Sequence, residues 1–404
     1  MNHSNKMKFG RYDFACFGSF IAYAACSLAV PMCLIEIANS LNFPLADGGK
    51  SAGGALQLGR SIPMVLAMFF CVFLAGKFGK RIVIALSVML MGFGVMLAAL
   101  SPAYILLFMA LATAGIGEGI IEGLATPVVQ EIHSDEDAGR YLNFSHSFWS
   151  IGTLLTTLGV GFALWYGVNW RIIIFICGLL SLLPSLIFLL PDKKKKFSNE
   201  TKANFSEVLS FGKDIIKAPR YWLFFFIMFF AGGGEFALTF WTATFIRLEC
   251  GGSAFLAGAA TAIFATGMIV GRMGSALVIP QKKLYHLILG AAALGIIVGC
   301  VLYFTTNIYL ILALLFIIGI SAGPFWPSIQ SYCCEERVTA FDSTTMYVLL
   351  SCAGIPGCGF FSWLLGATGD FLNLRASLLL VPICFAAVGI LTFFERKLPQ
   401  ITSK

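Results

Sequence analysis

Long apolar stretches separated by short polar ones run through almost the whole chain. A helix needs roughly 20 apolar residues to cross the hydrocarbon core of a bilayer. Stretches of that length fall at residues 12–38, 51–75, 81–100, 103–132, 141–166, 169–190, 219–247, 254–279, 284–304, 307–332, 343–369 and 374–394. The pattern therefore predicts an all-α integral membrane protein with twelve transmembrane helices.

The composition agrees with this pattern. Of the 404 residues, 58% are hydrophobic and 12% are charged, and the mean hydropathy is +0.87. Soluble proteins are about 45–50% apolar and about 25% charged, so most of this surface must face lipid. The composition excludes a cytosolic enzyme, a secreted domain and a disordered scaffold. It also makes the net charge of +7 a matter of membrane topology, with no nucleic-acid partner implied.

The basic residues predict the orientation. If both termini lie in the cytoplasm, the cytoplasmic segments hold 21 of the 27 Lys and Arg residues and the segments on the other side hold four. Cytoplasmic loops of membrane proteins carry such an excess. We therefore expect a multi-pass protein of the plasma (inner) membrane, in contact with lipid and with both termini in the cytoplasm.

One long polar stretch, residues 191–218, divides the chain near its midpoint. It predicts a cytoplasmic linker between two six-helix halves, residues 1–190 and 219–404. The halves look like repeats, because GIGEG begins at Gly115 and GISAG begins 204 residues later at Gly319. Many secondary carriers have two such halves, with the solute site near the midplane between them. Since one chain supplies both halves, we expect it to work as a monomer.

Motifs for metal or covalent chemistry are missing from the sequence. The twelve cysteines include no C-x-x-C pair and no Cys/His cluster, so neither a metal site nor a disulfide framework is predicted. The metalloprotease pattern H-E-x-x-H and the nucleophile pattern G-x-S-x-G do not occur either. We therefore expect no enzyme activity and no cofactor.

Two glutamates in the fourth predicted span are candidates for proton coupling. Glu118 and Glu122 stand four residues apart, on one face of the helix and near its middle. Two carboxylates this close repel each other, and removal from water also opposes ionisation, so at least one is expected to bind and release a proton. His146, near the inner end of the fifth span, is a further candidate because histidine titrates near neutral pH.

Two arginines also fall inside predicted spans. Arg60, in the middle of the second span, either pairs with Glu118 or Glu122 or binds an anionic solute directly, and we favour the pairing. Arg272 lies closer to the cytoplasmic side, from which a long side chain can reach water. We interpret it as a gate or packing residue.

The remaining polar and aromatic residues of the spans are candidate solute contacts. Glu235 follows three glycines, where the helix can unwind and the backbone can approach a solute. An indole can stack on the apolar face of a sugar ring and donate its N–H. The predicted contacts are Glu235, Trp241, Gln57, Arg60, Asn143, Trp326 and Gln330.

The basic turn between the second and third spans resembles a signature of the major facilitator superfamily. Its sequence, GKFGKR, is similar to the D-R-x-G-R-R loop of that superfamily, with Gly76 in the place of the acid. The basic pair Lys80–Arg81 is kept. The resemblance implies the twelve-helix fold of these carriers, with Lys80 and Arg81 at a cytoplasmic gate.

Within that superfamily, four segments resemble the fucose:proton symporter family. EGLATP from Glu122 is similar to E-x-x-A-N-P, and LNFSHSFWSIG from Leu142 is similar to L-N-x-x-H-x-F-x-x-x-G. Gly233-Gly-Glu followed by Trp241 resembles G-x-E-x(4–5)-W, and GISAGPFWP from Gly319 resembles G-x-x-x-G-x-x-F-P. The resemblance implies sugar transport, with Glu122 as the proton-linked acid.

The chain departs from this family in its first span. Sugar symporters of the family carry an acid there, whereas the matching stretch around Ser27 has none. Glu36 lies two turns or more further out, and whether it takes over that role is open.

Together these features predict a secondary active transporter. It would move a small polar solute, a sugar or sugar derivative, by alternating access with proton symport, although sodium coupling stays open. One alternative is a carrier for a sugar acid or another small organic anion bound through Arg60. A more remote alternative is a membrane scaffold or receptor that transports nothing.

Overall fold

A computed structural model describes residues 7–133, 138–190, 213, 215–338 and 343–400. The helices of the first half are α1 (Arg11–Met32), α2 (Leu34–Ser40), α3 (Lys50–Phe78), α4 (Lys80–Leu100), α5 (Tyr104–Ile132), α6 (Ala138–Trp165), α7 (Trp170–Leu180) and α8 (Leu183–Leu189). Those of the second half are α10 (Pro219–Leu248), α11 (Ala254–Val278), α12 (Leu284–Phe304), α13 (Ile308–Ala322), α14 (Phe325–Ser331), α15 (Ser343–Phe371), α16 (Leu374–Ser377) and α17 (Leu380–Arg396). The 3-10 turns η1 (Leu45–Asp47) and η2 (Gln281–Lys283) and the π-helical turn η3 (Tyr332–Arg337) complete the described elements.

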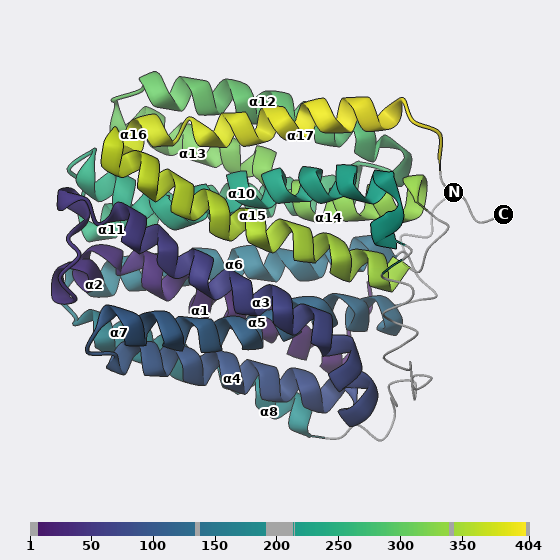
Figure 1. Ribbon diagram of the computed structural model, residues 1–404, viewed down its shortest axis with the longest axis horizontal. Helices are drawn as coiled ribbons and strands as arrows, with labels where there is room; N and C mark the ends of the chain where they lie inside the picture. Colours follow the sequence, from purple (N-terminus) through teal and green to yellow (C-terminus); the bar gives the residue numbers. More distant parts are fainter. Residues whose placement is uncertain (1–6, 134–137, 191–212, 214, 339–342, 401–404) are drawn as a thin grey trace.

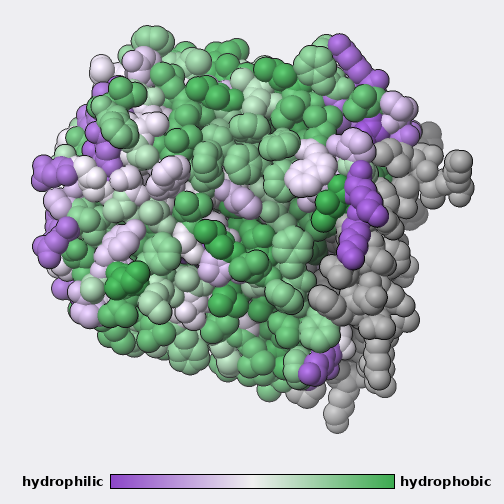
Figure 2. Space-filling view, in the orientation of Figure 1, coloured by the Kyte–Doolittle hydropathy of each residue, from purple (hydrophilic) through white to green (hydrophobic). Residues whose placement is uncertain are grey.

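The predicted all-α class and the predicted spans are confirmed. Twelve helical segments among the described residues are long and apolar enough to cross a membrane. Figure 1 shows the long helices running side by side along one axis. Hydrophilic residues gather at the two ends of the bundle and a hydrophobic band covers the middle, as Figure 2 shows. An apolar belt with polar ends is the surface that a bilayer requires.

Four predicted spans are interrupted. The first ends at Met32, after Pro31, and a turn at Cys33 separates it from α2. The sixth is divided between α7 and α8, the tenth breaks at Gly323–Pro324 between α13 and α14, and the twelfth is divided between α16 and α17. A proline inside a helix removes a backbone hydrogen bond and clashes with the preceding turn, which accounts for the breaks in the first and tenth spans.

Glycines set how closely the helices approach within each half. A Cβ added to Gly115 on α5 would clash with the carbonyl of Arg60 on α3. A Cβ on Gly319 of α13 would clash in the same way with the carbonyl of Phe264 on α11. Gly319 follows Gly115 by 204 residues, and Phe264 follows Arg60 by 204 residues. This is the offset of the repeat in the sequence. Close backbone approach through small residues is how membrane helices pack.

The two groups of helices meet along two similar seams. At one seam, Gly54 of α3 lies against the backbone of Ser362 on α15. At the other, Gly258 of α11 lies against the backbone of Thr157 on α6. Gly258 again follows Gly54 by 204 residues. Helices of both groups line the cavity described next.

We refer to the two ends of the bundle by their residues. The terminal end is where α1 begins at Arg11 and α17 ends at Arg396. The far end is the opposite one, where α3 begins at Lys50 and α15 ends at Phe371. The predicted linker, residues 191–218, lies almost wholly outside the described residues.

Candidate functional site

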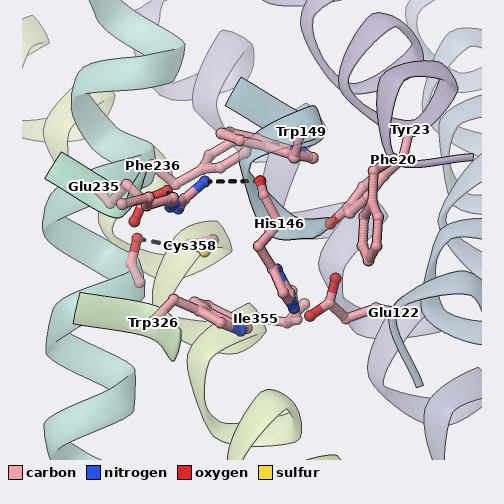
Figure 3. A pocket seen from close by; sticks show the side chains of 12 residues that line it. Phe20, Tyr23, Glu122, His146, Trp149, Glu235, Phe236, Trp326, Ile355 and Cys358 are labelled. Atoms are coloured by element: carbon pink, nitrogen blue, oxygen red, sulfur yellow. Dashed lines mark hydrogen bonds and ion pairs between the residues drawn. The ribbon is translucent and has the colours of Figure 1, made fainter. Parts of the chain in front are cut away.

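A cavity lies in the middle of the bundle. Figure 3 shows its walls, which combine aromatic rings with a few charged groups. Helices α1, α5 and α6 contribute Phe20, Tyr23, Glu122, His146 and Trp149, and helices α10, α11, α14 and α15 contribute Gly232, Glu235, Phe236, Arg272, Trp326, Ile355 and Cys358. A concave site of this kind, with a small number of placed polar groups, is typical of small-molecule binding.

An ion pair between Arg272 and Glu235 forms the charged centre of the cavity. Arg272 Nη2 donates to Glu235 Oε1 at 2.7 Å, and its Nε donates to the Gly323 carbonyl at 2.8 Å. Its Nη1 donates to the Ser150 hydroxyl at 2.8 Å and to the His146 carbonyl at 3.5 Å. Because Ser150 and His146 belong to α6, this guanidinium joins the two halves at mid-membrane.

This position corrects the expectation for Arg272. We expected a side chain that reaches water at the cytoplasmic side, in a gate or packing role. Arg272 is instead buried, lines the cavity and bonds Glu235. A charge held in a water-poor interior requires such partners, and the nearby carboxylate and carbonyls supply them.

Glu122 is the second carboxyl group of the cavity. It is buried on α5 and forms no ion pair with any residue that the structure describes. Arg272 and Glu235 act on it electrostatically across the cavity, and Ser351 of α15 offers it a hydroxyl. Because Arg272 is already paired with Glu235, one carboxyl group of the cavity is left without its own cation.

The α6 wall presents one helical face to the cavity. His146, Trp149 and Ser150 are spaced three and four residues apart, so they share that face. His146 Nε2 lies 3.1 Å from the Thr126 hydroxyl, and its ring lies 5.0 Å from that of Phe20. The Trp149 ring lies 5.6 Å from the Arg272 guanidinium. This wall thus combines polar atoms with apolar ring faces.

A second buried arginine–glutamate pair lies behind the cavity wall. Arg60 Nε donates to Glu118 Oε2 at 2.6 Å, and its Nη2 donates to the other oxygen of the same carboxylate. Arg60 is 1% exposed and neither residue lines the cavity. The expected pairing of Arg60 with a glutamate is confirmed. Its role as a solute contact stays a prediction.

Several predicted solute contacts lie elsewhere. Trp241 is fully buried between α10 and α15, and its indole N–H donates to the Ser362 carbonyl at 2.8 Å. Gln57 is buried but does not line the cavity. Gln330 lines a smaller neighbouring hollow and donates to Ser351 at 2.9 Å. The side chain of Asn143 lies outside the described residues. In this conformation, therefore, only Glu235 and Trp326 of the predicted contacts line the cavity.

The basic pair of the turn between α3 and α4 lies at the terminal end. Lys80 forms an ion pair with Glu131 at 2.8 Å, and Arg81 donates to the Leu189 carbonyl at 3.2 Å. Both partners belong to the same half as the pair. Three further ion pairs at this end also join elements of one half: His133 with Asp13, and Arg220 and Arg337 with Glu395.

At the far end, ion pairs cross from one half to the other. Glu36 of α2 bonds Arg247 of α10 at 2.7 Å. Asp370, at the end of α15, accepts the backbone N–H groups of Lys50 and Ser51 at 3.0 and 2.8 Å, and the Lys50 ammonium lies 3.6 Å away. Asp370 therefore caps the N-terminus of a helix in the other half, where a negative charge is favoured.

Glu36 lies at this far end in the present conformation. The first span lacks the acid of the similar family, and Glu36 was the candidate replacement. Glu36 is paired with Arg247 at the far end and does not line the cavity. The cavity acids are Glu122 and Glu235 instead.

Sequence reasoning missed the aromatic walls of the cavity. Phe20 and Tyr23 share one face of α1, and Trp149 lies three residues after His146. Helical spacing from His146 would have indicated Trp149. An aromatic residue in an apolar span carries no other signal, because lipid-facing and core positions favour the same residue types. Among the described residues, no group of three or more His, Cys, Asp and Glu side chains is placed to hold a metal ion.

Comparisons with known proteins support the same architecture. Residues 15–337 match the family model described as Major Facilitator Superfamily. A crystal structure of an E. coli fucose:proton symporter (FucP) variant aligns over 95% of this chain and 98% of its own, with a TM-score of 0.66 and 18% identity. A second FucP structure, described as outward, aligns over 96% and 99%, with a TM-score of 0.67 and 16% identity. At such identities the likeness shows the fold alone, and no curated protein sequence matched.

Proposed function

The chain belongs to the Major Facilitator Superfamily, whose members are membrane transporters and not enzymes, and from that premise we propose that it is a proton symporter for a neutral polar solute. The solute class we propose is a sugar or sugar derivative. Two solved structures with the same fold are those of a fucose:proton symporter, which is consistent with this class. The observation that carries the proposal is the cavity, in which Glu122 has no cation of its own beside the neutralised pair Arg272–Glu235.

The charges of the cavity favour a neutral solute with a proton. Arg272 and Glu235 compensate each other at 2.7 Å. The remaining carboxyl, Glu122, is compensated when it takes up a proton, and a buried charge without a partner is costly. The aromatic walls offer apolar faces to a ring, while the carboxyl groups accept hydrogen bonds from its hydroxyls. Proton uptake by Glu122 would thus accompany the loaded state.

In this conformation, the alternative of an anionic solute loses the cation that was proposed to bind it. Arg60 was the candidate cation for a sugar acid, but two of its nitrogens donate to Glu118 and it does not line the cavity. An anion in the cavity would meet Glu122 and would have to compete with Glu235 for Arg272. Both effects oppose its binding.

The links between the halves suggest how access to the cavity alternates. Cross-half ion pairs occur at the far end, whereas the described ion pairs of the terminal end stay within one half. We propose that Asp370 with Lys50, and Glu36 with Arg247, close the far-end mouth in this conformation. Opening that mouth would require both links to break as one half rocks against the other.

Weakening one of these links is expected to open the far-end mouth more often. In Asp370→Asn the side chain loses the charge that caps α3 and faces Lys50. Such contacts contribute about 0.3–1 kcal/mol when partly exposed, so the open population should rise roughly two- to fivefold. The measurement is the alkylation rate of Cys358, which lines the cavity, by an impermeant maleimide added at the far side.

Two controls accompany this measurement. Cys358→Ser identifies the labelled site in a chain with other cysteines. Glu249→Gln removes a far-end acid that caps Leu374, a residue of the same half, and should leave the rate unchanged. Equal labelling rates in Asp370→Asn and the unsubstituted protein would contradict a closing role for Asp370.

We further propose the orientation and location of the chain. Both termini would lie in the cytoplasm, so that the far end faces outward, because the basic residues concentrate at the terminal end. The membrane would be the plasma (inner) membrane, and a single chain would suffice, since the cavity is built from both halves of one chain.

Proton uptake driven by solute tests the proposed function. Proteoliposomes in a weakly buffered medium would receive neutral monosaccharides and sugar acids one at a time, while the external pH is recorded. A neutral sugar is expected to make the medium alkaline, since solute and proton enter together. Alkalinisation by sugar acids alone would favour the anion alternative, and solute entry without any pH change would exclude proton symport.

A further inference from the structure

The indole nitrogen of Trp326 is a buried hydrogen-bond donor without an acceptor. Trp326 lies in the first turn of α14, just after the break at Gly323–Pro324, and lines the cavity with 9% of its surface exposed. Its Nε1 is inaccessible and has no hydrogen-bond partner. A buried donor without an acceptor has lost its hydrogen bond to water and gained none in return, so a group that supplies the missing acceptor would be favoured there.

Trp241 shows that this donor is unusual within the same protein. Its indole is also buried, but its N–H donates to the Ser362 carbonyl at 2.8 Å. Trp241 stands outside the cavity and is satisfied by the backbone, whereas Trp326 stands in the cavity wall and is not. The missing acceptor of Trp326 therefore belongs to whatever fills the cavity.

Glu122 occupies the equivalent position in the other half. Trp326 follows Glu122 by 204 residues, the offset that also relates Gly115 to Gly319. Glu122 stands seven residues after Gly115, which packs α5 on α3. Trp326 stands seven residues after Gly319, which packs α13 on α11. Both residues line the cavity, and Figure 3 shows the Trp326 indole, the His146 imidazole and the Glu122 carboxylate gathered in one part of the view.

We infer that Trp326 and Glu122 hold the same hydroxyl group of the solute. The hydroxyl oxygen accepts the indole N–H, and the hydroxyl hydrogen is donated to the Glu122 carboxyl. A hydroxyl is the neutral group that both donates and accepts through one atom. This inference rests on the proposed function and deepens it, because it assigns a specificity-determining residue and one recognised group of a neutral ring polyol.

The arrangement links recognition to coupling. A solute that lacks this hydroxyl leaves the Trp326 N–H without an acceptor and the Glu122 carboxyl without this hydrogen bond. Sites built to bond a hydroxyl discriminate strongly against the analogue without it, because their buried polar groups stay unpaired. We therefore expect one position of the sugar ring to determine affinity more than the others.

Binding of deoxy analogues tests this inference. Purified protein in lipid nanodiscs would be titrated with neutral monosaccharides by calorimetry, and then with each monodeoxy analogue of one that binds. In the unsubstituted protein, one deoxy position should lower affinity roughly tenfold or more. Trp326→Phe keeps a ring in the wall but removes the N–H, so it should lower affinity for the intact sugar by a similar factor. In that variant the sensitive deoxy position should cause little further loss.

Trp241→Phe is the matched control, because it removes a satisfied N–H outside the cavity and should leave the deoxy pattern unchanged. Glu122→Leu, which removes the acceptor of the hydroxyl hydrogen, should weaken discrimination at the same ring position as Trp326→Phe. If Trp326→Phe binds the sugar normally and keeps the full deoxy pattern, the inference is wrong while the proposed function stands. If no neutral monosaccharide binds the unsubstituted protein, the proposed function itself fails, and this inference fails with it.

Discussion

Glu122→Gln is expected to abolish solute accumulation driven by a pH gradient while solute exchange continues. Glutamine keeps the size and hydrogen-bonding capacity of the side chain but cannot take up or release a proton. With one proton per solute, a gradient of one pH unit sustains about tenfold accumulation, because 1.4 kcal/mol corresponds to a factor of ten. Proteoliposomes of the unsubstituted protein should approach this ratio, and those of Glu122→Gln should stop at equal concentrations inside and outside.

Exchange of labelled for unlabelled solute separates coupling from folding. If Glu122→Gln exchanges solute but does not accumulate it, the variant folds and binds, and the defect lies in the proton step. Glu131→Gln is the matched control, since Glu131 lies on the same helix but pairs with Lys80 at the terminal end. Accumulation by Glu122→Gln as high as that of Glu131→Gln would show that protons are coupled elsewhere, or that another ion drives transport.

The spans could be predicted from the sequence because the bilayer imposes them. An unpaired backbone group in hydrocarbon is so costly that a long apolar stretch has few alternatives to a helix. Pro31 and the Gly323–Pro324 pair lie at two of the breaks, but a proline in a membrane helix is often accommodated by its neighbours. Whether the helix ends there depends on tertiary packing, which the apolar pattern does not contain.

The site could be predicted only in part. Arg60 and Arg272 are both arginines in the interior of an apolar span, and the sequence offered no way to place one in the cavity and one behind it. Their positions depend on how each helix is rotated about its axis. The close approach at Gly115 brings α5 against the backbone of Arg60, where Glu118 meets the guanidinium. Such rotations follow from contacts between helices distant in the chain, so hydropathy cannot reveal them.

The two buried arginine–glutamate pairs make the role of the cavity pair testable. Arg272→Gln with Glu235→Gln neutralises the pair that lines the cavity, and Arg60→Gln with Glu118→Gln neutralises the pair behind it. Removing one partner alone leaves a buried charge and costs about 3–5 kcal/mol, whereas replacing both partners together is often nearly neutral for stability. Both double variants are therefore expected to fold, with thermal unfolding midpoints in detergent close to that of the unsubstituted protein.

Their transport should nevertheless differ. The Arg60/Glu118 double variant should keep most of its solute exchange, because neither side chain lines the cavity. The Arg272/Glu235 double variant should lose exchange by roughly a hundredfold, because it loses a charged hydrogen-bond acceptor for the solute and the bonds from Arg272 to α6, each worth about 1.5–3 kcal/mol. Initial exchange rates in proteoliposomes measure both. Equal loss in the two variants would mean that buried charge supports the helix bundle in general, and equal retention would mean that the solute is held by the aromatic walls and Glu122 alone.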